Sequence, residues 1–166
     1  MRKFSDIEHD LYPDSYIFDI LNNVKSIAMV GASPRWNRPS NFAMKYLIRK
    51  GFKVFPVNPN SSQEKILGQL VYPDLKSLPD TVDMVDMFRP SSEALDLVRD
   101  SIKIDAKVFW MQLDIINKEA AKKAEEAGIQ VVMNRCPKIE YARLFGELGW
   151  NGINTGVVTN RRRRLK

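Results

Sequence analysis

Cysteine and histidine are almost absent from this sequence of 166 residues, which excludes several kinds of site. Cys136 is the only cysteine, so neither an internal disulfide nor a cysteine-rich metal site can form. His9 is the only histidine and lies in the N-terminal stretch. Zinc sites built from histidine and Ser-His-Asp triads need a histidine inside the domain, so we expect neither of them.

Long apolar runs are also missing. No run approaches the roughly 20 residues of a membrane-spanning helix, and the first residues turn acidic without the apolar core of a signal peptide. The hydrophobic share of 44% and the charged share of 28% are typical of a soluble globular protein. We therefore predict a cytoplasmic monomer or small homo-oligomer with no membrane partner and with a small-molecule ligand.

The sequence carries little net charge outside its last residues. The formal charge is +6, from 26 basic and 20 acidic residues, and five of the basic residues are Arg161 to Arg164 and Lys166. We predict one domain over residues 1–150 and a basic tail over residues 151–166, without a basic nucleic-acid surface on the domain. The tail could bind nucleic acid or an acidic membrane, but the lack of interleaved aromatic residues favours a solubilising end.

Short apolar strands alternate with helices along the chain. The pattern predicts strands at 26–31, 53–57, 81–88, 107–111 and 129–133, with a shorter strand within 68–73. It predicts helices at about 14–24, 40–50, 91–104, 117–128 and 137–148, with N-caps at Asp14, at Ser91 or Ser92, and at Asn117. This alternation indicates an α/β fold, a doubly wound and mostly parallel sheet of about five strands with helices on both faces, plus an N-terminal helix.

In such sheets, ligands bind beyond the carboxyl ends of the strands, where the strand order reverses. The loops after Gly31, Val57, Phe88 and Met111 should therefore share one edge of the sheet. We look for the ligand site among these four loops.

The loop after the first strand has features of a phosphate site. Gly31 lets a ligand approach the backbone closely, and the free N–H groups of a helix that begins near Pro39 favour an anion. Ser33 adds a hydroxyl, and Arg35 and Arg38 add cations suited to a pyrophosphate. The alternative is a plain connecting loop with two solvated arginines, and the loop alone does not decide between the two.

The loop lacks both the G-x-G-x-x-G fingerprint and the Lys-Ser/Thr end of a Walker A loop. NAD-binding domains usually hold the adenosine ribose with an acid after the second strand. This strand ends instead in Val57-Asn58-Pro59-Asn60. A ligand with a phosphate on that ribose would meet no repulsion, and coenzyme A (CoA) carries a 3′-phosphate.

Five motifs in this order resemble the stand-alone CoA-binding domain family, which is similar to the CoA-binding domain of the succinyl-CoA synthetase α subunit. The resemblance covers roughly residues 20–148. The motifs are Val30-Gly31-Ala32-Ser33 with Arg38-Pro39-Ser40, Val54-Phe55-Pro56-Val57-Asn58-Pro59, Val82-Asp83-Met84-Val85-Asp86-Met87-Phe88-Arg89, Val108-Phe109-Trp110-Met111-Gln112-Leu113 and Asn134-Arg135-Cys136-Pro137-Lys138-Ile139-Glu140.

The resemblance implies a Rossmann-like fold with CoA or an acyl-CoA as its ligand. It places the pyrophosphate at Gly31, Ala32, Ser33 and Arg38, and the adenosine at Asn58 and Pro59. It places Phe88 and Arg89 at the third loop, and Trp110, Met111 and Gln112 at the fourth, near the pantetheine arm. It also places Asp105 and Asp114 where the family favours glycine, and aspartate tolerates the left-handed conformation better than most residues.

Several alternatives stay open at this point. Trp110 could be a core residue, Arg89 could pair with Asp83 or Asp86, and Cys136 could be a buried small hydrophobe. We expect a CoA-binding carrier, sensor or regulator without catalytic residues of its own. The other possibilities are a CoA-binding subunit of an enzyme like an acyl-CoA synthetase, or a binder of another nucleotide cofactor.

Overall fold

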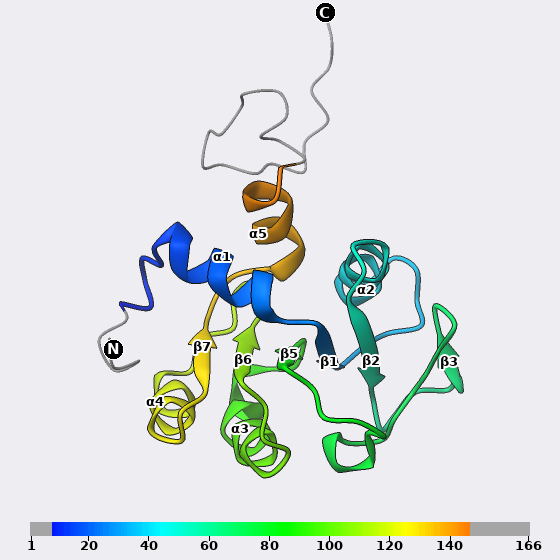
Figure 1. Cartoon of the computed structure of the whole chain (residues 1–166). Helices are drawn as coiled ribbons and strands as arrows, with labels where there is room; N and C mark the ends of the chain where they lie inside the picture. Colours follow the sequence, from blue (N-terminus) through cyan, green and yellow to red (C-terminus); the bar gives the residue numbers. More distant parts are fainter. Residues whose placement is uncertain (1–7, 147–166) are drawn as a thin grey trace, which may run out of the picture.

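The computed structural model describes residues 8–146, which form a parallel five-stranded sheet covered by helices on both faces (Figure 1). The strand order is β2-β1-β5-β6-β7, which confirms the doubly wound α/β fold. The strands are β1 (Ser26–Val30), β2 (Lys53–Val57), β5 (Met84–Met87), β6 (Val108–Met111) and β7 (Gln130–Val132). A small antiparallel hairpin of β3 (Lys65–Ile66) and β4 (Gln69–Leu70) lies between β2 and β5 in the chain.

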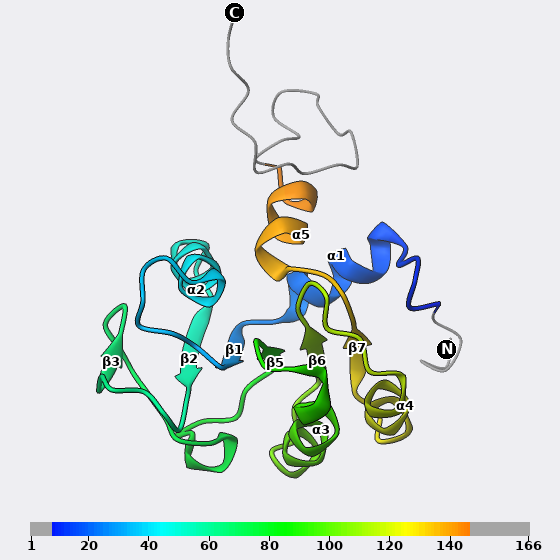
Figure 2. The ribbon, with the colours of Figure 1, turned by 180° about the vertical axis from the view of Figure 1, so that it is seen from behind.

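The helices divide between the two faces of the sheet, as both views show (Figures 1 and 2). One face carries α1 (Asp14–Asn23), α2 (Pro39–Arg49) and α5 (Pro137–Leu144). The other carries α3 (Ala94–Lys103) and α4 (Lys118–Glu126). Since a parallel sheet is buried on both faces, alternate residues of each strand enter two separate apolar cores.

Each core follows from the alternation along the strands. Val85 and Phe109 point toward α3 and α4, where the small side chains of Ala120 and Ala124 let the helix lie close to the sheet. On the opposite face, Trp110 on β6 and Val132 on β7 belong to the core under α1 and α2.

Asn117 caps α4 as predicted, because its Oδ1 accepts a hydrogen bond from the backbone N–H of Ala120 at 2.9 Å. The prediction of Asp14 as an N-cap was wrong. Pro13 occupies that position in an extended conformation, and Asp14 is the first helical residue. Its carboxylate lies 2.7 Å from Nη1 of Arg143 on α5, and an acid in the first turn is still favoured by the helix dipole.

The serine cap predicted for α3 was also wrong. Residues Ser91–Glu93 form a single 3-10 turn ahead of the helix, and Glu93 precedes its first residue without a side-chain cap. The Ser91 hydroxyl donates instead to the carbonyl of Ile116 at 2.6 Å, across to the next loop. The strand predicted at 81–88 spans only Met84–Met87. The Asp83 carboxylate just before it accepts hydrogen bonds from the N–H groups of Lys25 and Ser26.

Within residues 8–146, no helix has the length and apolar character to cross a bilayer. The basic tail, its boundary at residue 150 and the predicted end of the last helix at Leu148 lie outside the described residues.

Candidate functional site

The loops at the carboxyl ends of the strands are joined by backbone hydrogen bonds. The N–H of Gly31 donates to Val57 at 2.8 Å, and the N–H of Phe88 donates to Val30 at 2.8 Å. This confirms that the loops after β1, β2, β5 and β6 share one edge of the sheet. From β1 the chain runs outward to β2, and then returns to β5 on the other side of β1. The strand order therefore reverses between β1 and β5, where such sheets bind ligands.

Gly31 lies where the strand order reverses, and the close approach of the loop after β5 leaves no room there for a side chain. Its φ is 88°, and a Cβ there would lie 2.7 Å from the carbonyl oxygen of Phe88 and 2.9 Å from Cδ of Arg89. The glycine thus lets the first and third loops approach each other, a packing role in addition to the close ligand approach that the sequence predicts.

Ser33 is held by hydrogen bonds within the first loop and to α2. Its N–H donates to Oγ of Ser40 at 3.1 Å, and its carbonyl accepts from Nδ2 of Asn41 at 3.0 Å. Its hydroxyl oxygen accepts from the N–H of Arg35 at 3.2 Å. The loop is therefore held by its own Ser33 hydroxyl and by the side chains of Ser40 and Asn41 at the start of α2.

Asn58 ties the second loop to the first. Its Nδ2 donates to the carbonyl of Ala32 at 2.8 Å, and its Oδ1 accepts from the N–H of Asn60 at 2.9 Å. Ala32 is fully buried, whereas the neighbouring Pro59 is exposed. Asn58 thus fixes the distance between two loops that could border an adenosine, without adding a negative charge.

Arg35 and Arg38 are exposed at the N-terminus of α2. Arg38 directly precedes the helix and Pro39 is its first residue. Among residues 8–146, neither guanidinium takes part in an ion pair. Trp36 stands between them with 78% of its surface exposed. Two cations next to the free N–H groups of an eleven-residue helix make a surface suited to phosphate.

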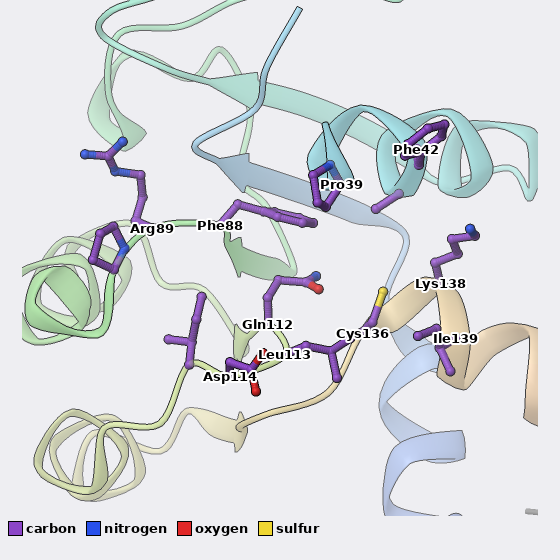
Figure 3. A pocket seen from close by; sticks show the side chains of 13 residues that line it. Pro39, Phe42, Phe88, Arg89, Gln112, Leu113, Asp114, Cys136, Lys138 and Ile139 are labelled. Carbon is purple, nitrogen blue, oxygen red and sulfur yellow. The ribbon is translucent and has the colours of Figure 1, made fainter. Parts of the chain in front are cut away.

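A cavity of about 590 Å³ opens beyond β5 and β6, beside α2 and α5, and we refer to it as the rim cavity (Figure 3). Aromatic and aliphatic side chains form most of its walls, and Gln112, Asp114, Cys136 and Lys138 provide polar groups. Its full lining is Pro39, Phe42, Ala43, Phe88, Arg89, Pro90, Gln112, Leu113, Asp114, Ile115, Cys136, Lys138 and Ile139. Concave, mostly apolar pockets with a few polar groups are typical of ligand sites.

Two predicted site residues do not direct their polar groups into the rim cavity. The Arg89 guanidinium makes two hydrogen bonds to Glu93, at 2.9 and 2.7 Å, and it points away from Gln112 and Cys136 (Figure 3). Its partner is thus neither of the two aspartates of β5 that the sequence suggested. Trp110 is fully buried in the core, and its Nε1 donates to the carbonyl of Arg135 at 2.8 Å.

The sequence analysis missed a buried polar pair next to the rim cavity. Asp86 on β5 is fully buried, and its Oδ1 accepts a hydrogen bond from Nε2 of Gln112 at 2.7 Å. Its Oδ2 has no partner among residues 8–146. Burial raises the pKa of Asp86 to about 7, and the hydrogen bond from Gln112 opposes that rise. The signal was present, because Asp86 alternates with Met84 and Phe88 on one face of a covered strand.

Cys136 also lines the rim cavity, immediately before α5. Burial raises the pKa of its thiol, the negative charge of Asp86 adds to that rise, and backbone N–H groups at Lys138 and Ile139 oppose it. The thiol is therefore kept protonated rather than activated. Within residues 8–146, no group of three or more histidine, cysteine or acidic side chains is placed to hold a metal ion.

Asp105 and Asp114, where the resemblance implies glycine, have left-handed backbones, with φ of 56° and 66°. This confirms that aspartate can replace glycine at these turns. The N–H of Asp114 donates to Oδ1 of Asn134 at 2.8 Å, which fixes the loop at the exposed end of the rim cavity.

The profile of a family described as "CoA binding domain" matches residues 25–142, well over half of the chain. The chain belongs to this CoA-binding domain family. The match includes every strand of the main sheet and all four loops of the candidate site. The family resemblance drawn from the five motifs is thereby confirmed.

Small proteins of similar length are among its relatives. The chain is 34% identical over 126 residues to a Bacillus subtilis protein named "Uncharacterized protein YneT", covering 76% of this chain and 92% of that one. A hypothetical protein from Pyrococcus horikoshii has a solved structure that is 42% identical, with a TM-score of 0.78, over 88% of this chain and all of that one.

Larger relatives contain a similar domain as one part. An ADP-forming acetate–CoA ligase of Archaeoglobus fulgidus is 31% identical over 82% of this chain, which spans only 20% of that enzyme. A dinucleotide-forming acetyl-coenzyme A synthetase of Candidatus Korarchaeum cryptofilum is 26% identical, with a TM-score of 0.59, over 69% of this chain and 27% of that one.

Proposed function

We propose that this protein binds CoA or an acyl-CoA and acts as a carrier, sensor or regulator in the cytoplasm, without catalytic residues of its own. The observation that carries the proposal is the placement of two features at one edge of the sheet. A cationic helix N-terminus and the rim cavity both lie where the strand order reverses. A nucleotide with a long, uncharged arm matches both features.

The residues present fit the phosphates of CoA. Arg35, Arg38 and the N–H groups at the start of α2 would hold the pyrophosphate, since charged hydrogen bonds to phosphate are the strong ones. Asn58 and Pro59 would border the adenosine. The absence of an acid in this loop leaves the 3′-phosphate unopposed.

The rim cavity fits the pantetheine arm, which combines methylene groups with two amides. Phe88, Leu113 and Ile139 offer apolar contact, and Gln112 offers a side-chain amide within the wall. The pantetheine arm needs only a few polar partners, and the mostly apolar lining provides a few.

A second candidate function follows from the enzyme relatives. Because similar domains form parts of acetate–CoA ligases, this chain could serve as the CoA-binding subunit of an acyl-CoA synthetase-like assembly. Its only histidine, His9, is hydrogen-bonded to Tyr12 and paired with Glu125, away from the rim cavity. Any catalytic group would then have to come from a partner subunit, and co-purification with an ATP-dependent ligase subunit would favour this candidate.

Calorimetric titration of the full chain with CoA, dephospho-CoA and NAD tests the proposal. We expect binding of CoA, weaker binding of dephospho-CoA, which lacks the 3′-phosphate, and no detectable binding of NAD. Absence of heat with CoA, or equal affinity for all three compounds, would contradict it. Mass spectrometry of small molecules released from the natively purified protein would show whether CoA or an acyl-CoA is retained.

A further inference from the structure

Asp86 is a buried acid that the packing of the sheet does not explain. It faces the α2/α5 side of β5, between Met29 on β1 and Trp110 on β6, and it is fully shielded from solvent. Gln112 is its only hydrogen-bond partner within residues 8–146, and Oδ2 has none. A buried polar atom without a partner is rare in folded proteins and calls for a ligand or another polar group nearby.

Gln112 connects this acid to the rim cavity. Its side chain belongs to the cavity wall (Figure 3), and its Nε2 donates a hydrogen bond to the buried carboxylate of Asp86. An ionised carboxylate can only accept hydrogen bonds, so it holds the amide nitrogen of Gln112 toward itself and leaves Oε1 free for the cavity. A protonated carboxyl instead brings a donor into the pair, which can satisfy Oε1 or face the cavity.

We propose that Asp86 is a positioning residue for Gln112, and that the ionised pair makes the rim cavity select the free thiol of CoA over an acyl thioester. The proposal rests on the proposed function. A thiol offers an S–H donor to Oε1 of Gln112, which the ionised pair leaves free, whereas a thioester carbonyl offers only an acceptor and finds no donor at that oxygen. Protonation of Asp86 reverses this preference, and the rim cavity then accepts the thioester.

The charge of Asp86 also acts on a thiol of the protein itself, that of Cys136 in the wall of the rim cavity. The negative charge of Asp86 contributes to the raised pKa of the Cys136 thiol, so a thiol beside it stays in the S–H form. The other charged groups in the cavity lining are Arg89, held by Glu93, Asp114 after β6 and Lys138 on α5. The part of α2 that lines the cavity, from Pro39 to Ala43, contributes no charge. Since the pKa of Asp86 is about 7, the preference should change near neutral pH.

The test is the ratio of the dissociation constants of acetyl-CoA and CoA, measured by calorimetry on the full chain at about pH 5.5 and 7.5. The ratio cancels the titration of the ligand phosphates, which have a pKa near 6 and are common to both compounds. Over this range a free thiol, with a pKa of about 8.5, stays mostly protonated. We expect the ratio to rise by about threefold to tenfold from the lower to the higher pH, the effect of one hydrogen bond.

Three variants separate the possible causes. Asp86→Asn should make the ratio independent of pH, because the amide cannot ionise. Gln112→Leu should flatten it as well, whereas a direct effect of the Asp86 charge on the ligand would persist. Asp114→Asn, which removes an exposed carboxylate from the same cavity, should keep the wild-type pH dependence.

The outcomes distinguish this inference from the proposed function. If the wild-type protein binds CoA but the ratio does not change with pH, or if Asp86→Asn or Gln112→Leu retains the full change, the role of the pair is wrong. If neither CoA nor acetyl-CoA binds at either pH, the proposed function itself fails. Should Asp86→Asn not fold, the wild-type ratio and Gln112→Leu still decide the question.

Discussion

The two faces of the sheet differ in what they bury. The face under α3 and α4 is closed by apolar side chains, and its fully buried polar residue, Ser101, bonds to its own helix through the carbonyl of Leu97. The face under α1, α2 and α5 buries two acids, Asp86 and Glu140, together with Gln112, and it opens into the rim cavity. The first face thus contributes mainly to stability. The second is less completely packed with apolar side chains and leaves a cavity that suits a ligand.

The loops repeat this contrast at the edge of the sheet. Gly31 and Asn58 join neighbouring loops to one another and so fix the edge, as the backbone does within the strands. Arg35 and Arg38 make no ion pair among the described residues and are available to a ligand. Gly31 and Asn58 are thus committed to neighbouring loops, whereas the two arginines are not.

The largest effect should come from opening the closed face. Phe109→Ala should lower the free energy of unfolding by about 3–5 kcal/mol, because it leaves a cavity in a fully packed core. Phe42→Ala is the matched control on the other face, where the ring is 48% exposed and lines the rim cavity, and it should cost less than about 1 kcal/mol. Urea denaturation measures both, and similar losses would remove the distinction between the faces.

The next effect concerns the pH dependence of stability. In the unfolded chain Asp86 ionises at about pH 4, whereas in the folded protein its pKa is about 7. Below about pH 4, Asp86 is protonated in both the folded and the unfolded state. Between about pH 4 and 7 only the folded state holds the proton, so the free energy of unfolding falls as the pH rises. Above about pH 7 this loss of stability is complete. As the pH rises from 5 to 8, the free energy of unfolding of Asp86→Asn should therefore increase by about 2–3 kcal/mol relative to that of the wild type.

Asp83, three residues earlier in the chain, gives a control of opposite sign. Burial raises its pKa, but hydrogen bonds from Lys107 and from the N–H groups of Lys25 and Ser26 outweigh burial and hold the pKa below its usual value. Asp83→Asn should therefore lose stability relative to wild type, and the loss should be present at neutral pH and vanish in acid. If both variants shifted in the same direction with pH, burial would not explain the behaviour of Asp86.

The sequence predicted the frame well because the frame follows local rules. Period-two apolar strands, the Asn117 cap and the tolerance of Asp105 for a left-handed turn are all decided within a few residues. The errors at Asp14 and Ser91 arose where a side chain found a distant partner in place of the local one, on α5 and on the loop after β6. Propensity cannot show such partners, since they are neighbours only in the folded protein.

The candidate site was predicted only in part, because some of its residues are brought together only in the folded protein. The exposed arginines of the first loop could be found from their position before a helix, but the lining of the rim cavity combines four separate segments. Whether Arg89 turns toward that cavity or toward Glu93 depends on the 3-10 turn that brings Glu93 within reach. Asp86 was visible in the sequence as an acid in a buried strand, but its partner Gln112 follows a different strand, β6, and meets it only in the folded protein.

The contrast between frame and binding surface predicts a moderate loss of CoA affinity for Arg38→Ala. Removing a charged hydrogen bond to phosphate should cost about 1–3 kcal/mol of binding free energy, and the loss should shrink as salt rises. Arg49→Ala removes the same charge from the exposed last turn of α2 and should leave the affinity nearly unchanged. Equal losses in the two variants would indicate a general charge effect rather than a phosphate site at the helix N-terminus.

The smallest effect should come from Arg89→Ala. Its guanidinium already makes two hydrogen bonds to Glu93, and both side chains are about two-fifths exposed. Such a pair contributes about 1 kcal/mol or less to stability, and a ligand could use Arg89 only by competing with Glu93. We therefore expect less than about 1 kcal/mol change in CoA affinity, by calorimetry under the conditions used for Arg38→Ala. A loss as large as that of Arg38→Ala would mean that Arg89 leaves Glu93 when CoA binds, and that the phosphate site extends across the third loop.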